Sequence, residues 1–505
     1  MRLNFVRSTA PCRSNRKTRL NRLTHLHRLA LPLVLVASLS GCASLFGNDE
    51  PDTGTRLGSV VGPQRNAQGL TGVGRASEAE NLAITNGGFV LADEPLAALV
   101  ARDVLERGGN VADAATALYF TLSVTQPAAA GLGGGGICLI HDPFERTTES
   151  VEFLPRRAAA GGPVAIPGNV RGFALLQALY GQSSWLSLLA PAERLAATGT
   201  PVSRAMARGL APHAAILRAD PELSRGLLSR SGAVLKEQDK TVQVELASTL
   251  GLVRSRGVAA LYSGDGVATL VAGIADAGGR VSVEDLRNYR PVVSDAAMRL
   301  SDGVEVYFPS ANVGAGAFAT AMWDALQTIS PTDGAGSLQA ANATARSLGV
   351  SETLPDDLGS TGFVVVSSRG HAVACAVTMN GPFGTGRTAR GMGVTLASAP
   401  DEPVRGLAGA FLAPVIATGP GNATLVFAGA SGGGPNAVAG VQQVLRQTLG
   451  ASRQNISSAL QSATPGSSVL VNALVCPSGL PLGFNKCEIG IDPEGAGLGV
   501  EAVSP

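Results

Sequence analysis

A serine flanked by glycines stands at residues 429–433, where the chain reads Gly-Ala-Ser-Gly-Gly. This G-x-S-x-G pattern, between a strand-like run and a helix-like run, is typical of a nucleophile elbow, a strained turn that exposes a serine hydroxyl for acyl transfer. The serine of such an elbow needs an acid and then a histidine later in the chain. The last histidine of this chain is His371. The motif therefore predicts a Gly-rich turn, and Ser431 makes a poor nucleophile.

Two other patterns could hold a cofactor or a metal ion. Residues 131–136 fit G-x-G-x-x-G, but they follow a helix-like segment and precede a strand-like one, the reverse of the dinucleotide-binding order. His141, His213 and His371 are far apart in the sequence and lack the spacing of metal ligands. We therefore expect no cofactor and no metal site.

Helix and strand patterns alternate in the first half of the chain. Residues 87–127 read as a strand, a helix closed by glycines, and a second helix that ends before Pro127. Residues 133–142 and 148–154 read as paired strands, and residues 167–181 read as a helix with apolar positions three and four residues apart.

The second half is richer in strands. Residues 362–380 read as two strands joined by a turn at 368–370, and residues 423–449 read as a strand, a Gly-rich turn and a helix. The sequence thus predicts a mixed architecture, with the glycines of residues 429–433 between the last of these strands and its helix.

The composition excludes several classes of protein. Of the 505 residues 45% are hydrophobic, enough to bury a large core, so a chain disordered throughout is excluded. Six cysteines are too few for a disulfide scaffold of this length. Residues 1–41 contain eight Lys and Arg and no acidic residue, which leaves the rest of the chain net acidic. A nucleic-acid-binding surface is therefore not expected.

The first 41 residues have the three parts of an export signal. A basic stretch leads into an apolar run at 29–37, too short to span a bilayer, and Leu-Ser-Gly-Cys follows at 39–42. This order resembles the bacterial lipobox, in which cleavage before Cys42 leaves its thiol to be acylated. An ordinary signal peptide with an incidental cysteine is the alternative. Residues 42–80 read as a flexible tether, and the expected location is the periplasmic face of a Gram-negative envelope membrane.

Export also permits disulfide bonds. Cys476 and Cys487 flank a turn-rich loop, and we expect them to pair. Cys138 and Cys375 lie in apolar strand-like runs, so we expect them to be buried as small hydrophobic side chains, with Cys375 a free thiol.

An ordered set of segments points to a family. The segments are residues 108–142, 164–181, 249–274, 281–293, 360–386 and 429–445. Together they resemble the γ-glutamyltranspeptidase (glutathione hydrolase) family of N-terminal-nucleophile hydrolases. The resemblance implies an α+β fold, a four-layer αββα sandwich, made as one precursor that cuts itself into two subunits. The corresponding regions here are 81–359, large-subunit-like, and 360–505, small-subunit-like.

The resemblance also implies a set of site residues. In that family the cut precedes a Thr-Thr-His-aromatic stretch, and the freed threonine is the nucleophile. Ser360-Thr361-Gly362-Phe363 occupies this place, and the register follows from Thr378-Met379-Asn380, which matches the family's Thr-x-Asn. The implied roles are cleavage between Gly359 and Ser360, Ser360 as nucleophile, Thr378 as its orienting partner, Gly432 and Gly433 as oxyanion hole, and Asn380 and Glu402 as ligands of the substrate's α-amino end.

Serine can carry out both steps that this chemistry requires. A hydroxyl at a new N-terminus lies beside its own α-amine, whose pKa near 8 lets it accept the hydroxyl proton around neutral pH. Before cleavage the same hydroxyl can attack the preceding carbonyl, which Gly359 leaves sterically open. Gly432 and Gly433 would present backbone N–H groups to the oxyanion with no side chain in the way. Alternatively, Ser360 is a turn residue, and the two glycines form only a tight turn.

Three positions depart from the family pattern. The arginine that binds the γ-glutamyl α-carboxylate is replaced by Leu154, and Arg156 or Arg157 substitutes for it only if the strand end bends. The family's serine pair is replaced by Ala410-Phe411, and its histidine after the double threonine by Gly362.

We therefore expect an exported, self-processing amidohydrolase or acyltransferase that acts on γ-glutamyl compounds such as glutathione, or on a related small-molecule or peptide amide. The alternative is an inactive family member that serves as a binding or scaffold protein of the cell envelope. The sequence leaves open the acyl donor and acceptor and the oligomeric state.

Overall fold

The structure is a computed structural model. It describes residues 87–351, 353–355, 357–402, 404–450, 453–463, 465 and 469–503. The predicted signal at 1–41, Cys42 and the predicted tether at 42–80 lie outside the described residues. No helix in the described part of the chain has both the length and the apolar character needed to cross a bilayer.

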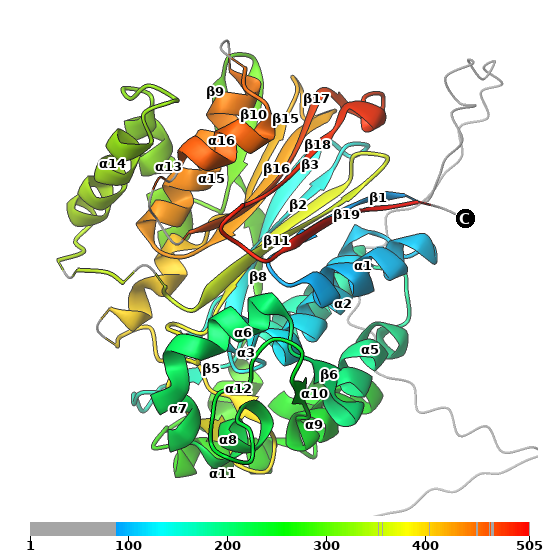
Figure 1. The fold of residues 1–505 in the computed structure, drawn as a ribbon, viewed down its shortest axis with the longest axis vertical. Helices are drawn as coiled ribbons and strands as arrows, with labels where there is room; N and C mark the ends of the chain where they lie inside the picture. Colours follow the sequence, from blue (N-terminus) through cyan, green and yellow to red (C-terminus); the bar gives the residue numbers. More distant parts are fainter. Residues whose placement is uncertain are drawn as a thin grey trace, which may run out of the picture. The chain divides into compact units, whose positions relative to one another are not determined.

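Two antiparallel sheets lie face to face at the centre of the fold (Figure 1). The first has the strand order β19-β1-β11-β12-β2-β3-β8 and the second the order β18-β17-β16-β15-β10-β9. The first sheet is built from β1 (Gly88–Ala92), β2 (Gly135–Asp142), β3 (Thr147–Phe153), β8 (Val292–Asp295), β11 (Ser360–Ser367), β12 (Ala372–Thr378) and β19 (Leu498–Ala502). The second is built from β9 (Ala297–Ser301), β10 (Val304–Phe308), β15 (Val415–Thr418), β16 (Leu425–Gly432), β17 (Leu470–Leu480) and β18 (Glu488–Ile491).

Strand β11 shows why the sheets stack. Its side chains alternate between the two faces, as strand geometry requires. Phe363 and Val365 join the core on the helix side of the sheet, whereas Val364 and Val366 join the core between the two sheets. Because both faces are buried, the strand reads as one apolar run rather than as alternating apolar and polar residues.

Helices cover the outer face of each sheet, which completes four layers (Figure 1). On the first sheet pack α1 (Pro95–Glu106), α2 (Val111–Thr125) and α4 (Asn169–Tyr180), and α5 (Trp185–Thr198) and α9 (Val244–Arg256) lie behind α2. On the second sheet pack α13 (Gly314–Leu326), α15 (Pro435–Leu449) and α16 (Ile456–Ala463), and α14 (Gly334–Ser347) lies against α13 and α15. The expected αββα sandwich is confirmed.

The remaining elements are short and connect these layers. The helices are α3 (Pro127–Ala130), α6 (Arg204–Leu210), α7 (Ala214–Ala219), α8 (Pro221–Leu227), α10 (Ala259–Tyr262), α11 (Val267–Asp276) and α12 (Val283–Asn288), with 3-10 turns η2 (Ala211–His213), η3 (Arg405–Phe411) and η4 (Phe484–Lys486). The strands are β4 (Arg156–Arg157), β5 (Ala165–Ile166), β6 (Thr200–Pro201), β7 (Lys240–Thr241), β13 (Thr388–Ala389) and β14 (Val394–Thr395).

The boundary at residues 359 and 360 does not separate two folded units. Strands β11 and β12 follow it in the sequence, yet they lie between β1 and β2, which precede it. In the second sheet β9 and β10 precede the boundary, and β15 to β18 follow it. The two regions therefore share both sheets.

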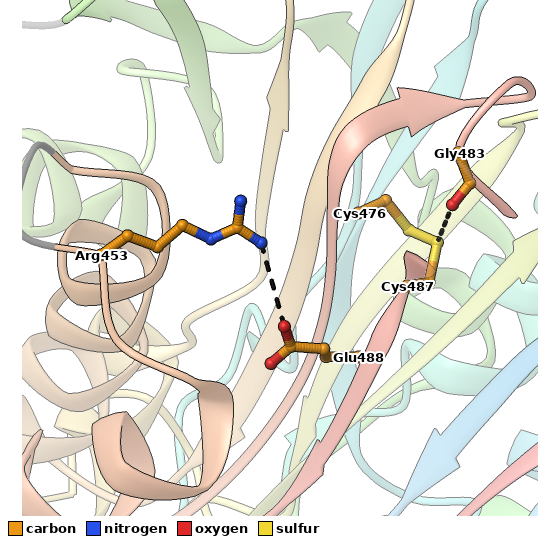
Figure 2. The surroundings of a disulfide bond; sticks show 5 residues. All are labelled: Arg453, Cys476, Gly483, Cys487 and Glu488. Carbon is orange, nitrogen blue, oxygen red and sulfur yellow. Dashed lines mark hydrogen bonds and ion pairs between the residues drawn. A yellow bond between two sulfur atoms is a disulfide. The ribbon is translucent and has the colours of Figure 1, made fainter. Parts of the chain in front are cut away.

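The cysteines form two disulfides, one expected and one not. Cys476 and Cys487 are joined across the loop between β17 and β18 (Figure 2). The expectation of a free Cys375 is wrong, because Cys375 is joined to Cys138. These two residues are direct partners on the neighbouring strands β12 and β2, with their Cα atoms 4.1 Å apart. Both are fully buried, as expected.

Candidate active site

Ser360 is the first residue of β11, and its side chain meets the end of a strand from the other sheet. The N–H of Gly433 donates to Ser360 Oγ over 2.8 Å. Gly433 lies directly after β16 and just before α15. The strand, Gly-rich turn and helix predicted around residues 429–433 thus place a backbone donor on this hydroxyl.

Glycine is required where the two sheets approach each other at this point. A Cβ on Gly432 would lie 2.3 Å from the carbonyl oxygen of Ser360. A Cβ on Gly362 would lie 2.6 Å from the nitrogen of Ser431. Gly433 itself has φ of +140°, a value that L side chains rarely adopt. These glycines permit a close approach of backbones, which is more than a turn alone would need.

Gly359, the residue before Ser360, is held through both its carbonyl and its own N–H. The carbonyl oxygen of Gly359 accepts from the N–H of Met379 over 2.9 Å and from the hydroxyl of Thr378 over 3.2 Å. The N–H of Gly359 donates to Asp357 Oδ1 over 2.7 Å. Gly359 has φ of +64°, and a Cβ there would lie 2.1 Å from the backbone of Gly381. In this uncut chain the Thr378 hydroxyl therefore orients the carbonyl before Ser360. The resemblance implied a different role, in which Thr378 orients the hydroxyl of Ser360.

A cavity of about 890 Å³ opens beside Ser360, Gly432 and Gly433. Its apolar lining comes mainly from α3, α6, α16 and the start of β17. Its charged lining consists of Arg208 and the carboxylates Asp93, Asp357, Asp492 and Glu494. The hydroxyl of Ser360 thus borders a space large enough for a small-molecule substrate.

Asp93 is a site residue that sequence reasoning missed. It is 5% exposed and accepts a hydrogen bond of 2.6 Å from the hydroxyl of Thr361 and one of 2.8 Å from the side-chain amide of Asn472. Burial raises the pKa of Asp93 to about 6, against these hydrogen bonds, which lower it. In the sequence Asp93 reads as an ordinary turn residue between a strand and a helix, so nothing in the pattern pointed to it.

Asn380 lies on the other side of Thr378 and does not line the cavity. Its backbone N–H donates to the Thr378 hydroxyl over 2.9 Å, and its side-chain N–H donates to the carbonyl of Ser398 over 2.9 Å. Its Oδ1 is buried and makes no hydrogen bond within the described part of the chain. A Cβ on Gly409 would lie 4.0 Å from this oxygen and 3.5 Å from Leu154 Cδ2, so Asn380 and Leu154 face one small region.

That region is apolar. Leu154 packs against a buried cluster of Ile137, Ala315, Ala376 and Leu412. A guanidinium or a carboxylate in such surroundings would lose its hydration without a partner. The position at which the family has its arginine is therefore filled by hydrocarbon.

The other two predicted substrate ligands do not line the cavity beside Ser360. Arg156 is exposed on β4, and its guanidinium stacks 4.8 Å from the ring centroid of Tyr289. Glu402 is half-buried in a turn in which its N–H donates to the carbonyl of Ala399. Neither lines the cavity, so the bend that would bring Arg156 to the site is not present.

The serine of the G-x-S-x-G motif does not line the cavity. Ser431 is fully buried, and its hydroxyl donates to the carbonyl of Ala437 over 2.7 Å, as a structural serine does. Among the described residues, no three His, Cys, Asp or Glu side chains come together as metal ligands.

The chain is similar to known proteins both in sequence and in fold. Residues 97–335 match the family model for gamma-glutamyltranspeptidase. The glutathione hydrolase proenzyme of Bacillus subtilis is 30% identical over 42% of this chain and 40% of its own length, and glutathione hydrolase proenzyme 2 of Schizosaccharomyces pombe is 35% identical over 44% and 38%. The chain thus spans about two-fifths of the curated relatives that it matches.

The fold match extends further than the sequence match. The crystal structure of cephalosporin acylase from Bacillus halodurans superimposes with a TM-score of 0.66 at 17% identity, and the match covers 86% of this chain and 98% of that one. Ser360, Thr378 and Gly433 lie beyond residue 335, so the matched family segment does not contain them.

Proposed function

We propose that the chain, whose residues 97–335 match the γ-glutamyltranspeptidase family model, is a divergent member of that family and a self-processing amidohydrolase or acyltransferase with Ser360 as its nucleophile. One observation carries this proposal. The Ser360 hydroxyl receives a backbone hydrogen bond at the edge of a cavity, directly after a peptide carbonyl that two donors hold.

The proposed cut begins with attack of Ser360 Oγ on the carbonyl carbon of Gly359. Negative charge then develops on the Gly359 oxygen, where the N–H of Met379 and the hydroxyl of Thr378 already donate. The bond from Gly359 C to Ser360 N breaks, the hydroxyl proton passes to the departing nitrogen, and an ester links Gly359 to Ser360 Oγ. This step already frees the α-amine of Ser360, and water then hydrolyses the ester, which frees the hydroxyl and leaves Gly359 as a carboxylate.

The cut turns Gly359 into the C-terminal carboxylate of the first product, which is no longer tied to Ser360. Once this chain end moves away, the Thr378 hydroxyl is free to bind Ser360, so the implied orienting role belongs to the cut enzyme. The α-amine of Ser360 can then take the hydroxyl proton as Oγ attacks a substrate amide. The N–H of Gly433 is placed to stabilise the resulting oxyanion.

The substrate is an amide whose acyl group fits the cavity beside Ser360. γ-Glutamyl compounds are the donors that the related enzymes suggest, but Leu154 and its apolar neighbours offer no cation for the α-carboxylate. We therefore expect weak turnover of γ-glutamyl donors compared with acyl amides that lack this carboxylate. The same cluster favours the second candidate function, a binding protein that retained the fold and lost the chemistry.

A substrate assay separates the two candidates. Purified protein is incubated with a chromogenic γ-glutamyl anilide and with anilides of uncharged acyl groups, alongside Ser360→Ala. Release of the chromophore from any donor by the unaltered protein, and none by Ser360→Ala, supports the enzyme. Equal background release by both proteins from every donor would leave the binding protein.

We also propose that the protein is an exported lipoprotein anchored through Cys42. The basic and apolar run before Leu-Ser-Gly-Cys supports this, and two disulfides fit an oxidising compartment. Changing Cys42→Ala should move the protein from the membrane fraction to a soluble or uncleaved form. Equal membrane recovery of both forms would contradict the anchor.

A further inference from the structure

Three segments that are distant in the sequence meet at the buried carboxylate of Asp93. Its Oδ2 accepts from the hydroxyl of Thr361, the second residue of β11, and its Oδ1 accepts from the amide of Asn472 on β17. The same amide of Asn472 donates to the carbonyl of Gly362 over 2.9 Å. One carboxylate thus connects the end of β1 with the beginning of β11 and with the opposite sheet.

Asp93 is itself held firmly. It follows the last residue of β1 and precedes Glu94, which caps α1 by accepting from the N–H of Ala97 over 2.9 Å. The carboxylate of Glu94 also accepts from the hydroxyl of Thr125 over 2.9 Å. A side chain fixed in this way between a strand and a helix can hold its own partners in place.

The geometry points to a role in placing Ser360, and it rests on the proposed self-processing function. We propose that Asp93 is a positioning residue, which holds Thr361 and Gly362 so that Ser360 Oγ stays on the N–H of Gly433, both in the uncut chain and after Ser360 becomes a chain end. Newly formed chain ends fray unless side chains or sheet bonds hold them. The hydrogen bond of Thr378 to Gly359 cannot do this after the cut, because Gly359 is then no longer covalently bonded to Ser360.

The surroundings of Asp93 indicate that its charged carboxylate destabilises the folded chain. It is almost fully buried, and the nearby carboxylate of Asp492 opposes its charge. A buried carboxylate beside another one destabilises a fold unless it is well bonded. Asp93 lines the same cavity as Ser360. A destabilising group beside a nucleophile is typical of a residue that is kept for function.

Thr361 offers the sharpest test, because Thr361→Val keeps the shape of the side chain and removes only the donor to Asp93. Thr361→Ser restores the hydroxyl. Thr249→Val is the matched control. Thr249 lies on α9 and is also buried, and its hydroxyl donates over 2.7 Å to the carbonyl of Met392. Each full-length chain is made by cell-free translation under oxidising conditions, and timed samples are reduced and separated on denaturing gels.

We expect Thr361→Val to cut roughly 10- to 100-fold more slowly than the unaltered chain, as a small misplacement of a reacting group does. Thr361→Ser should cut near the original rate, and so should Thr249→Val. A purely structural role would lower the melting temperature of both valine variants alike without separating their cutting rates.

Three results would overturn the positioning role in different ways. If the unaltered chain cuts and Thr361→Val cuts equally fast, Asp93 does not position Ser360, while the proposed function stands. If the unaltered chain never cuts, both fail together. Failure of Thr361→Ser to restore cutting would also contradict the role, because the hydroxyl is then not what matters.

Discussion

The position of Ser360 depends on glycines, because two backbones approach each other there too closely for any side chain. A Cβ on Gly432 would lie 2.3 Å from the Ser360 carbonyl oxygen, far inside van der Waals contact, and this neighbour is backbone that cannot turn aside. Two positions later, a Cβ on Gly434 would first meet the flexible side chain of Leu358 at 3.4 Å. A side chain at Gly432 would therefore clash with backbone, whereas one at Gly434 would not, although the two glycines are only two residues apart.

The pair makes a matched prediction. Gly432→Ala should displace Ser360 and lower the rate of cutting by at least about 100-fold, as the loss of an oxyanion-hole group does. Gly434→Ala should cut close to the original rate. Timed denaturing gels measure both, and equal cutting by the two variants would show that the close approach of β16 to Ser360 is not needed.

Asp93 makes a prediction about pH. Its pKa in the fold is about 6, above the ordinary 3.8, so the fold binds the proton more tightly than the unfolded chain does. Stability is then greatest below pH 4 as far as this group is concerned and falls as the pH rises towards and past 6. Asn cannot titrate, so Asp93→Asn should lose this dependence.

We therefore expect the unfolding free energy of Asp93→Asn, relative to the parent, to rise by up to about 3 kcal/mol between pH 4 and pH 7. Denaturant unfolding in a Ser360→Ala background, which keeps both chains uncut, measures the difference. A difference between the two that does not change with pH would contradict the shifted pKa.

At the scale of elements, local patterns were enough to predict much of the fold. The strand at the start of residues 87–127 is β1, the two helices are α1 and α2, and the second ends at Thr125, just before Pro127. Residues 133–142 and 148–154 pair as β2 and β3. Glycine, proline and apolar periodicity act within a few residues, so the sequence displays them directly.

Pairings between distant elements could not be predicted in the same way. Cys138 and Cys375 are 237 residues apart, and only the register of β2 against β12 makes them partners. The same holds for Asp93, whose partners are set by how β1, β11 and β17 converge. Arg156 could replace the missing arginine only if the strand end after Leu154 bent, and whether it bends depends on contacts with distant residues such as Tyr289, over which the guanidinium of Arg156 stacks.

At the scale of the whole molecule, the cut would fall within a structure that its two products share. Strand β11, which begins at the cut, lies between β1 of the first product and β12 of the second. Cys138 precedes the cut and Cys375 follows it, so their disulfide would link the two products covalently. This bond, which sequence reasoning missed, determines how the cut must be observed.

The central claim is tested most directly by denaturing gels of the purified protein, run with and without reducing agent, followed by N-terminal sequencing. With reductant, the account predicts two chains, the smaller one beginning at Ser360. Without reductant, the chains should migrate together through the bond between Cys138 and Cys375. Ser360→Ala should give one chain under both conditions. A single intact chain from the unaltered protein after long incubation and reduction would contradict the account.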